Sequence, residues 1–137
     1  MAAAVRAVDY FYITVRDVPG QAYRFLAALS AAGVNLLAFN IIPVGLEQTQ
    51  LVVFPEDASK MQGLAEGRNL VISGPQRAFL IQGDDQLGAL VDIHRTLAEA
   101  DINVYASSGV TDGRGGYGYV LYVRSSDFDG ARKALGL

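Results

Sequence analysis

A Pro–Gly pair stands where an alternating apolar run meets an Ala/Leu-rich run, in the stretch RDVPGQA at residues 16–22. Pro19 suits the first position of a helix, and Gly20 allows a sharp turn from strand to helix. The open amides of that helix N-terminus favour a carboxylate. Asn35 follows the other end of the expected helix, and its side-chain amide has both a donor and an acceptor. These residues could hold a zwitterion, but the pair could also only shape a turn, and Asn35 could cap the backbone.

The chain repeats itself after 68 positions. Residues 11–35 align with residues 79–103, and 7 of these 25 positions are identical. A period of this length indicates duplicated small domains rather than a solenoid. We predict two domains, at residues 1–74 and 75–137. The identical pairs include Asp17 with Asp85, Gly20 with Gly88, and Asn35 with Asn103.

Each copy predicts a strand, a helix with one apolar stripe, two further strands and a short helix. The first helix ends at Gly33, and Asp101 takes that position in the second copy, where aspartate tolerates the left-handed conformation. In the first copy we expect strands at 10–15, 35–43, 48–54 and 69–74, with helices within 22–32 and 55–67. In the second copy we expect strands at 78–82, 103–110 and 117–123, with helices within 90–100 and 125–136.

This order is that of the ferredoxin-like split βαβ arrangement. We predict an α+β protein of two tandem ferredoxin-like βαββαβ units, the second without an obvious last strand. Helices should cover one face of each antiparallel sheet. The runs LLAFNII and QLVVF are apolar at both parities, which predicts that the second face is at least partly buried.

The missing strand would leave one edge of the segment RAFLIQG unpaired, and such an edge invites uncontrolled pairing. Three segments could fill it: the N-terminal AAAVRAV, an edge of a second chain, or the strand NLVISG shared between units. A symmetric dimer is the commonest source of a partner surface, so we predict a homodimer.

The two loops and helix exits resemble those of ACT domains, over nearly the whole chain as two tandem units. The second copy departs from the motif, because it lacks the proline of the loop and the glycine before its asparagine. In ACT domains the loop and this asparagine often bind an amino acid where two domains meet. The resemblance therefore implies an amino-acid ligand. The implied ligand-binding residues are Asp17, Val18, Pro19, Gly20, Asn35, Asp85, Gln86, Leu87, Gly88 and Asn103.

Composition excludes several classes of protein. Of the 137 residues 51% are hydrophobic and 18% are charged, which argues against disorder. The net charge of -3 argues against nucleic acid as a partner, and the absence of cysteine excludes disulfides and thiolate metal sites. No apolar run reaches the length of a membrane span. We expect a soluble, cytoplasmic protein with no membrane partner.

Two motifs near the C-terminus have alternative interpretations. The stretch GRGGYG has the spelling of a dinucleotide loop, but a strand rather than a helix follows it, which favours a hairpin loop. The stretch GGYGYVLY resembles the octapeptide of RNA-recognition domains, with Tyr117 and Tyr119 as the base-stacking pair. Its first position is glycine instead of a basic residue, which weakens that alternative.

No pair of side chains suggests catalysis or metal binding. His94 is the only histidine and stands on a mostly apolar helical stripe, where packing is the usual role. We therefore predict no enzyme activity, no metal and no cofactor.

The leading hypothesis is a stand-alone tandem ACT protein that binds an amino acid and acts as an allosteric regulatory module through domain or subunit interfaces. Two such units leave no room for a catalytic domain, so the regulated activity would reside in a partner enzyme. The alternative is a purely structural dimerisation module with empty loops, and RNA binding comes third.

Overall fold

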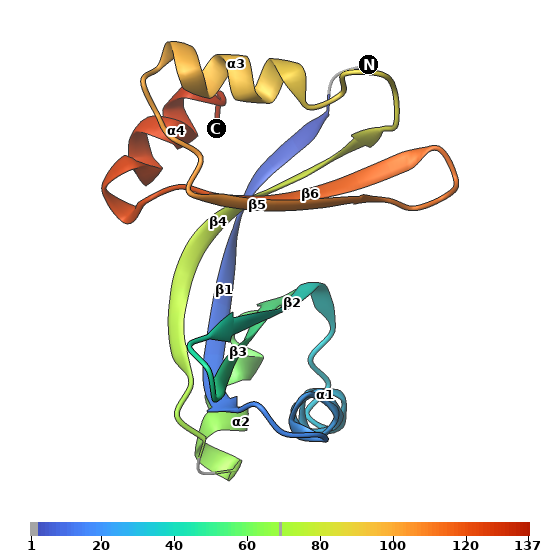
Figure 1. Ribbon diagram of the computed structural model, residues 1–137, viewed down its shortest axis with the longest axis vertical. Helices are drawn as coiled ribbons and strands as arrows, with labels where there is room; N and C mark the ends of the chain where they lie inside the picture. Colours follow the sequence, from blue (N-terminus) through green and yellow to red (C-terminus); the bar gives the residue numbers. More distant parts are fainter. Residues whose placement is uncertain (1–2, 69) are drawn as a thin grey trace. The chain divides into compact units, whose positions relative to one another are not determined.

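The computed structural model describes residues 3–68 and 70–137 of the chain (Figure 1). Its elements, in chain order, are β1 (Ala4–Arg16), α1 (Gln21–Ala31), β2 (Leu36–Val44), β3 (Gln48–Pro55), α2 (Lys60–Arg68), β4 (Ser73–Asp84), α3 (Val91–Glu99), β5 (Ala106–Thr111), β6 (Gly116–Tyr122), the 3₁₀ turn η1 (Ser125–Asp127) and α4 (Phe128–Ala134).

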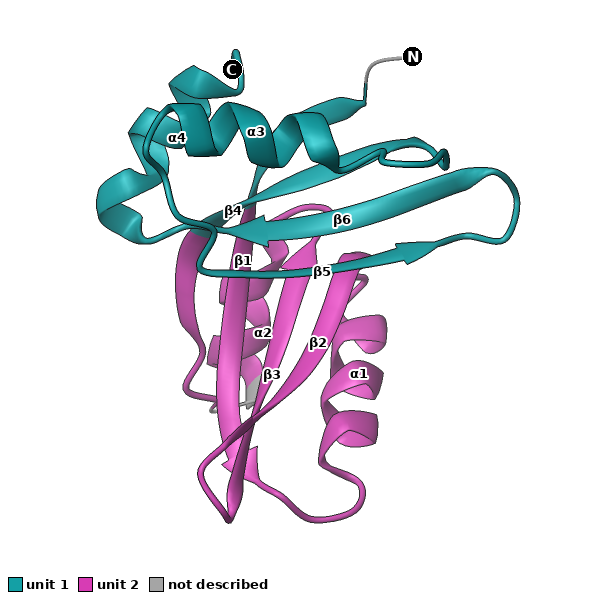
Figure 2. Cartoon of the chain, turned by 45° about the horizontal axis from the view of Figure 1, so that its top comes forward, with its two compact units in different colours: residues 1–8, 77–137 teal, residues 9–76 magenta. Residues whose placement is uncertain are grey.

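The chain forms two compact units, which Figure 2 colours separately. Unit 1 holds Met1–Val8 and Arg77–Leu137, and unit 2 holds Asp9–Gln76. The hydrogen-bonded strand order is β2-β3-β1-β4-β6-β5. Strands β1 and β4 are each divided between the two units, so that one part of each strand belongs to unit 1 and the other part to unit 2. The predicted division into residues 1–74 and 75–137 does not coincide with these two units. The main difference is that the segment ending at Val8 groups with the second repeat.

The N-terminal segment occupies the place of the strand that the second repeat lacks. Gly83 of β4 lies beside Ala3, and Gly74 lies beside Phe11, so β4 runs antiparallel to β1. Ala3 and Val5 also pack against the core of unit 1. The N-terminal segment is the first of the three segments that we expected could pair with the free edge of RAFLIQG. The free edge therefore gives no reason for a dimer, and the homodimer stays a prediction.

Strand β4 corrects the prediction of two separate strands at 69–74 and 78–82. It is one continuous strand that begins at Ser73, and residues 70–72 before it are not in a strand. Asn69 lies outside the described residues. Strand β5 also begins three residues later than the expected start at residue 103.

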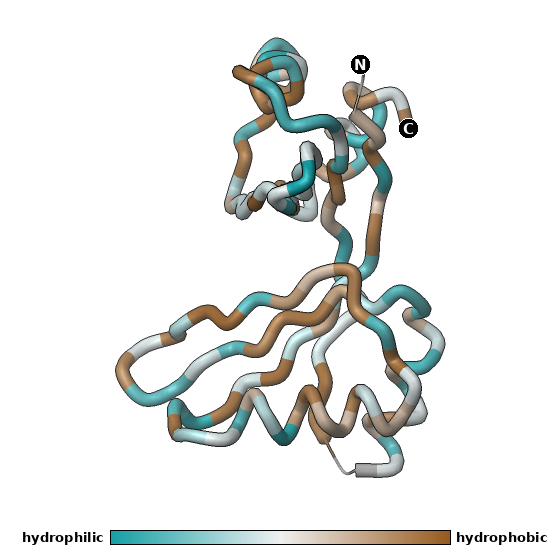
Figure 3. Tube along the Cα trace, turned by 90° about the vertical axis from the view of Figure 1, so that its right-hand side faces the viewer, coloured by the Kyte–Doolittle hydropathy of each residue, from teal (hydrophilic) through white to brown (hydrophobic). Residues whose placement is uncertain are grey.

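The core of unit 2 lies between its strands and its helices α1 and α2. Phe25, Ala28 and Leu29 of α1 recur at helical spacing and are buried against Phe11 of β1 and Val53 of β3, together with residues of α2. Figure 3 shows the hydrophobic residues of this unit running along its strands. Burying each large apolar side chain stabilises the fold by roughly 1.5–3 kcal/mol.

The core of unit 1 repeats this plan with α3 and α4. Leu97 of α3 and Phe128 of α4 are buried against Phe79 and Leu121 of the sheet. The rings of Phe79 and Phe128 stack with centroids 4.6 Å apart. In each unit both helices thus share one core with the same face of the strands, which confirms the predicted layers.

The opposite face of the strands is buried in part, as predicted. Val52 and Phe54 alternate with the core residues of β3 and are still 3% and 1% exposed. Leu80 of β4 and Val120 of β6 are buried in the same way. This double burial explains why the strand sequences are apolar at both parities.

Candidate functional site

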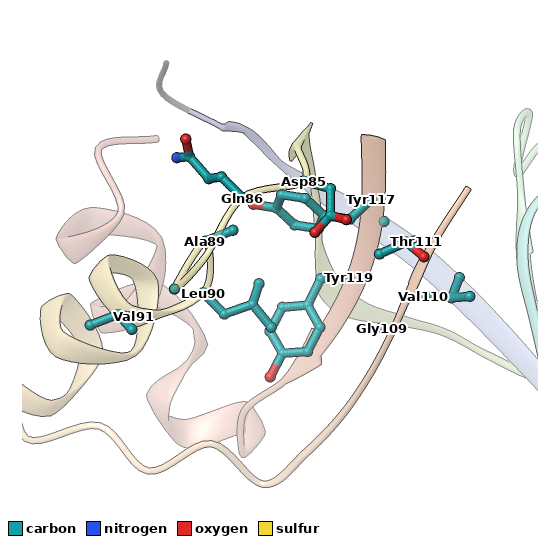
Figure 4. Close-up of a pocket in the computed structure, with 12 residues that line it drawn as sticks. Asp85, Gln86, Ala89, Leu90, Val91, Gly109, Val110, Thr111, Tyr117 and Tyr119 are labelled. Atoms are coloured by element: carbon teal, nitrogen blue, oxygen red, sulfur yellow. The ribbon is translucent and has the colours of Figure 1, made fainter. Parts of the chain in front are cut away.

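A depression of about 470 Å³ opens in unit 1 between the loop that precedes α3 and the strands β5 and β6. Figure 4 shows the side chains of Tyr117 and Tyr119 directed from β6 toward this loop, with Leu90 beside the Tyr119 ring. The depression brings predicted loop residues of the second copy together with the two tyrosines. Its lining residues are 85–86, 88–91, 109–111 and 117–119.

The loop is held to the tip of the β5–β6 hairpin by its backbone. The Asp85 amide donates to the Gly115 carbonyl at 2.8 Å. In unit 2 the Asp17 amide donates in the same way to the Glu47 carbonyl, also at 2.8 Å. The repeat therefore preserves this tie between loop and hairpin, which fixes one side of the depression. Gly88, at φ 73°, then turns the loop toward α3.

Asp112 stiffens the hairpin tip that holds the loop. Its Oδ1 accepts hydrogen bonds from the amides of Arg114 at 2.6 Å and Gly116 at 3.1 Å. These two backbone bonds hold the pKa of the Asp112 carboxyl below its ordinary value, because they favour the charged form. The Asp112 carboxylate thus accepts hydrogen bonds from the Arg114 and Gly116 amides in the turn.

Tyr119 forms the floor of the depression. It is 6% exposed, and its hydroxyl lies 2.8 Å from Nε2 of His94 on α3. Gly109 faces it across the β5–β6 ladder, where a Cβ atom would lie only 2.8 Å from Cδ1 of Tyr119. The ring can therefore lie over β5 only because residue 109 has no side chain.

The walls of the depression are mostly apolar, with polar groups at the rim. Leu90, Val91 and the rings of Tyr117 and Tyr119 line it, and Asp85 is the one charged residue among the lining residues of this described part of the chain. Burial raises the pKa of the Tyr117 hydroxyl, so this group is neutral at pH 7. The arrangement can hold a small ligand with an apolar body and a cationic group.

The loop of the first copy has the predicted turn. Gly20 adopts φ 93° immediately before α1, and Gly33 adopts φ 75° after its end. Asp101 adopts φ 59° at the matching exit in unit 1, which confirms the predicted left-handed conformation there. The guanidinium of Arg24 lies over Gly20, 3.1 Å from the position that a Cβ would take.

Asn35 lies at the far end of α1 from the first loop. The helix has 11 residues and separates the two by roughly 16 Å at 1.5 Å per residue, so one amino acid cannot touch both within unit 2. The Asn35 side chain donates from Nδ2 to the Glu56 carboxylate at 2.9 Å, and the backbone carbonyl of Asn35 accepts from the Glu56 amide at 2.8 Å. It also lines a second depression, of about 430 Å³, whose lining does not include Asp17, Val18, Pro19 or Gly20.

Two predicted residues of the second copy do not line the depression of unit 1. Leu87 is fully exposed, and Asn103 follows the far end of α3. Sequence reasoning also missed residues that do line it: Leu90, Val91 and Gly109–Thr111. Leu90 could have been inferred as a lining residue, because it follows Gly88 by two positions in the same loop. The lining residues of β5 could not, because their place depends on the register of β5 with β6.

The alternative interpretations can be compared with this geometry. The stretch GRGGYG contains the end of the turn between the paired strands β5 and β6 and the first three residues of β6, which confirms the hairpin. Tyr119 packs among core residues on the face that α3 and α4 cover, so an RNA strand cannot lie along this face of the sheet and stack its bases there. No cluster suited to a metal ion occurs within the described residues, and no helix there is long and apolar enough to cross a membrane.

Comparisons with known proteins locate the fold. No protein-family model and no curated protein matches the sequence. Among solved structures, the chain is similar to protein BT0572 from Bacteroides thetaiotaomicron, with a TM-score of 0.81 and 14% identity over 96% of this chain and 88% of that one.

It is also similar to the ligand-free regulatory subunit of aspartate kinase from Thermus thermophilus, with a TM-score of 0.66 and 13% identity over 98% of this chain and 95% of that one. Aspartokinase alpha and beta subunits give a TM-score of 0.60 and 18% identity over 100% and 99% of the two chains. At such identities the likeness shows the fold. It confirms the predicted tandem ferredoxin-like units and is consistent with the ACT resemblance.

Proposed function

We propose that this chain is a regulatory module that binds an amino acid in the depression of unit 1. The observation that carries the proposal is the convergence of the second strand-to-helix loop with Tyr117 and Tyr119 around one concave, mostly apolar surface. Small-molecule sites commonly combine such walls with a few polar groups. The similar fold of the aspartate kinase regulatory subunit supports a regulatory role.

The loop offers partners for both ends of an amino acid. Asp85 supplies a carboxylate for the ammonium group. The amides of Ala89 and Val91 donate to carbonyls of the loop, whereas the amides of Gly88 and Leu90 make no hydrogen bond within the described residues. These two amides are available for the ligand carboxylate. The proposed ligand-binding set is therefore Asp85, Gln86 and Gly88 together with Leu90, Tyr117 and Tyr119.

Binding can be tested by thermal shift with the common amino acids. A ligand at about 100 times its dissociation constant adds roughly 2.7 kcal/mol to the stability of the native state. For a chain of this size that raises the melting temperature by several degrees. If no amino acid at 10 mM moved the midpoint, the alternative of a structural module without ligand would be favoured.

Two adjacent aspartates provide a matched pair of variants. Asp85 lines the depression and Asp84, at the end of β4, does not. Asp85→Ala should weaken binding about ten- to a hundredfold, because a hydrogen bond to a charged group contributes roughly 1.5–3 kcal/mol. Asp84→Ala should change affinity less than twofold. Equal effects of the two changes would contradict the assigned role of Asp85.

The module would act on another polypeptide, a partner enzyme whose activity the ligand controls. We propose that it does so as a homodimer, since β2 and β5 end the strand order of the sheet and every residue of β5 is exposed. Such edges pair readily with other strands. Sedimentation velocity at micromolar concentration tests this. A clean monomer of 14.6 kDa, with and without ligand, would exclude the dimer.

A further inference from the structure

The side chains of the depression point to one class of amino acid, and this inference rests on the proposed function. The interior surface comes from the alkyl group of Leu90 and the rings of Tyr117 and Tyr119, which lie beside each other along β6 in Figure 4. Ala89 and Val91 extend this apolar surface along the start of α3.

Tyr119 lines the depression with the small exposed part of its side chain, and its hydroxyl is engaged elsewhere. The hydroxyl lies at hydrogen-bond distance from His94, on the side toward α3, and the two rings are tilted by 46°. Gly109 lets the ring lie against the neighbouring strand. The floor is therefore an apolar surface that suits an aliphatic or aromatic group.

The charges around the depression leave no partner for a charged side chain of the ligand. Asp85 is the one charged lining residue in this described region, and the ligand ammonium group uses it. Arg95 on α3 is paired with Asp92 at 2.9 Å, and Arg114 lies in the hairpin tip and does not line the depression. A side-chain carboxylate of the ligand beside Asp85 would be repelled, and a cationic side chain of the ligand would lose hydration without compensation.

We infer that the site selects amino acids with a large apolar side chain, such as leucine or phenylalanine, over small or charged ones. The volume of about 470 Å³ is far more than a methyl side chain fills. A small ligand therefore leaves the apolar surface formed by Leu90, Tyr117 and Tyr119 in contact with water. Each methylene that a longer side chain buries strengthens binding about fourfold at full burial.

Isothermal titration calorimetry on the full chain tests this with L-leucine, L-phenylalanine, L-alanine, L-glutamate and L-lysine. Leucine and phenylalanine should bind at least tenfold more tightly than the other three. Tighter binding of glutamate, lysine or alanine would overturn the selectivity while leaving amino-acid binding intact. No binding of any amino acid would overturn the proposed function itself, and this inference with it.

Two leucines of the same loop provide the matched variants. Leu90→Ala should weaken leucine binding about tenfold and alanine binding less than twofold, because only the larger ligand reaches the lost surface. Leu87→Ala should change neither, since Leu87 is fully exposed and lies outside the depression. Leu90→Met should restore most of the leucine affinity. An equal loss for both ligands in Leu90→Ala would show a structural role for Leu90 and overturn its role in selectivity.

Discussion

Replacing Gly109 with alanine would test whether the floor of the depression depends on a strand position without a side chain. The added methyl group would lie 2.8 Å from Cδ1 of Tyr119 and 3.3 Å from the Gly118 carbonyl oxygen. Ordinary van der Waals contact begins at 3.4 Å. The Tyr119 ring would therefore have to swing by about half an ångström or more, away from its position beside His94.

The expected magnitude follows from two opposing effects. Overpacking of a well-packed site lowers stability by about 1–3 kcal/mol. Replacing glycine by alanine raises stability by about 0.4–1 kcal/mol, because the unfolded chain loses freedom. Gly118→Ala is the matched control on the partner strand, since a Cβ there meets nothing within 4 Å. The unfolded-state effect cancels between the two variants, so Gly109→Ala should be about 1–3 kcal/mol less stable than Gly118→Ala.

Urea unfolding measures this difference. The chain has seven tyrosines and no tryptophan, so tyrosine fluorescence and far-ultraviolet circular dichroism are suitable probes. The midpoint should fall in Gly109→Ala without a change in the slope m. His94 is the only histidine, and its ring protons should show altered NMR shifts in Gly109→Ala alone. Equal midpoints and unchanged His94 signals would refute the idea that Gly109 supports the Tyr119 ring.

Further predictions concern the N-terminal strand, Asn35 and Asp112. Val5→Asp should lower stability by roughly 1–3 kcal/mol and speed hydrogen exchange in residues 77–84, because Val5 packs on the core of unit 1. The exposed change Arg6→Asp should stay within about 0.5 kcal/mol, and similar effects of the two would argue against this packing. Asn35→Ala should lower the free energy of unfolding by about 0.5–1.5 kcal/mol, because it removes the hydrogen bond to Glu56, and should leave amino-acid affinity unchanged. A tenfold weaker affinity would instead support the predicted role of Asn35 in binding. The stability that Asp112 contributes is present above the unfolded carboxyl pKa of about 4 and is lost as the pH falls through the lower folded value. In melting curves from pH 7 to pH 2, the melting temperature of Asp112→Asn should therefore fall less on acidification than that of the unchanged protein. An unchanged pH profile would contradict this role of Asp112.

The sequence by itself determined the helices, most of the strands and the turns of both repeats. Helical spacing of Phe25 and Leu29 and the apolar runs of the strands are local patterns, so they predict local structure without knowledge of partners. The left-handed residues Gly20, Gly33 and Asp101 could be predicted for the same reason, since backbone sterics act within one residue and its neighbours. The loop residues Asp85 and Gly88 could be selected as site candidates because they repeat Asp17 and Gly20.

The tertiary structure alone decided which strands pair and where the ligand surface forms. The N-terminal strand pairs with β4 across more than 70 positions of sequence, and no local pattern specifies such a partner. The depression likewise depends on the β5–β6 register that places Gly109 opposite Tyr119, and on a backbone bond from Asp85 to Gly115. Local patterns recur in both copies, but only long-range packing made the second loop, which lacks the Pro–Gly pair, the one that lines this concave surface.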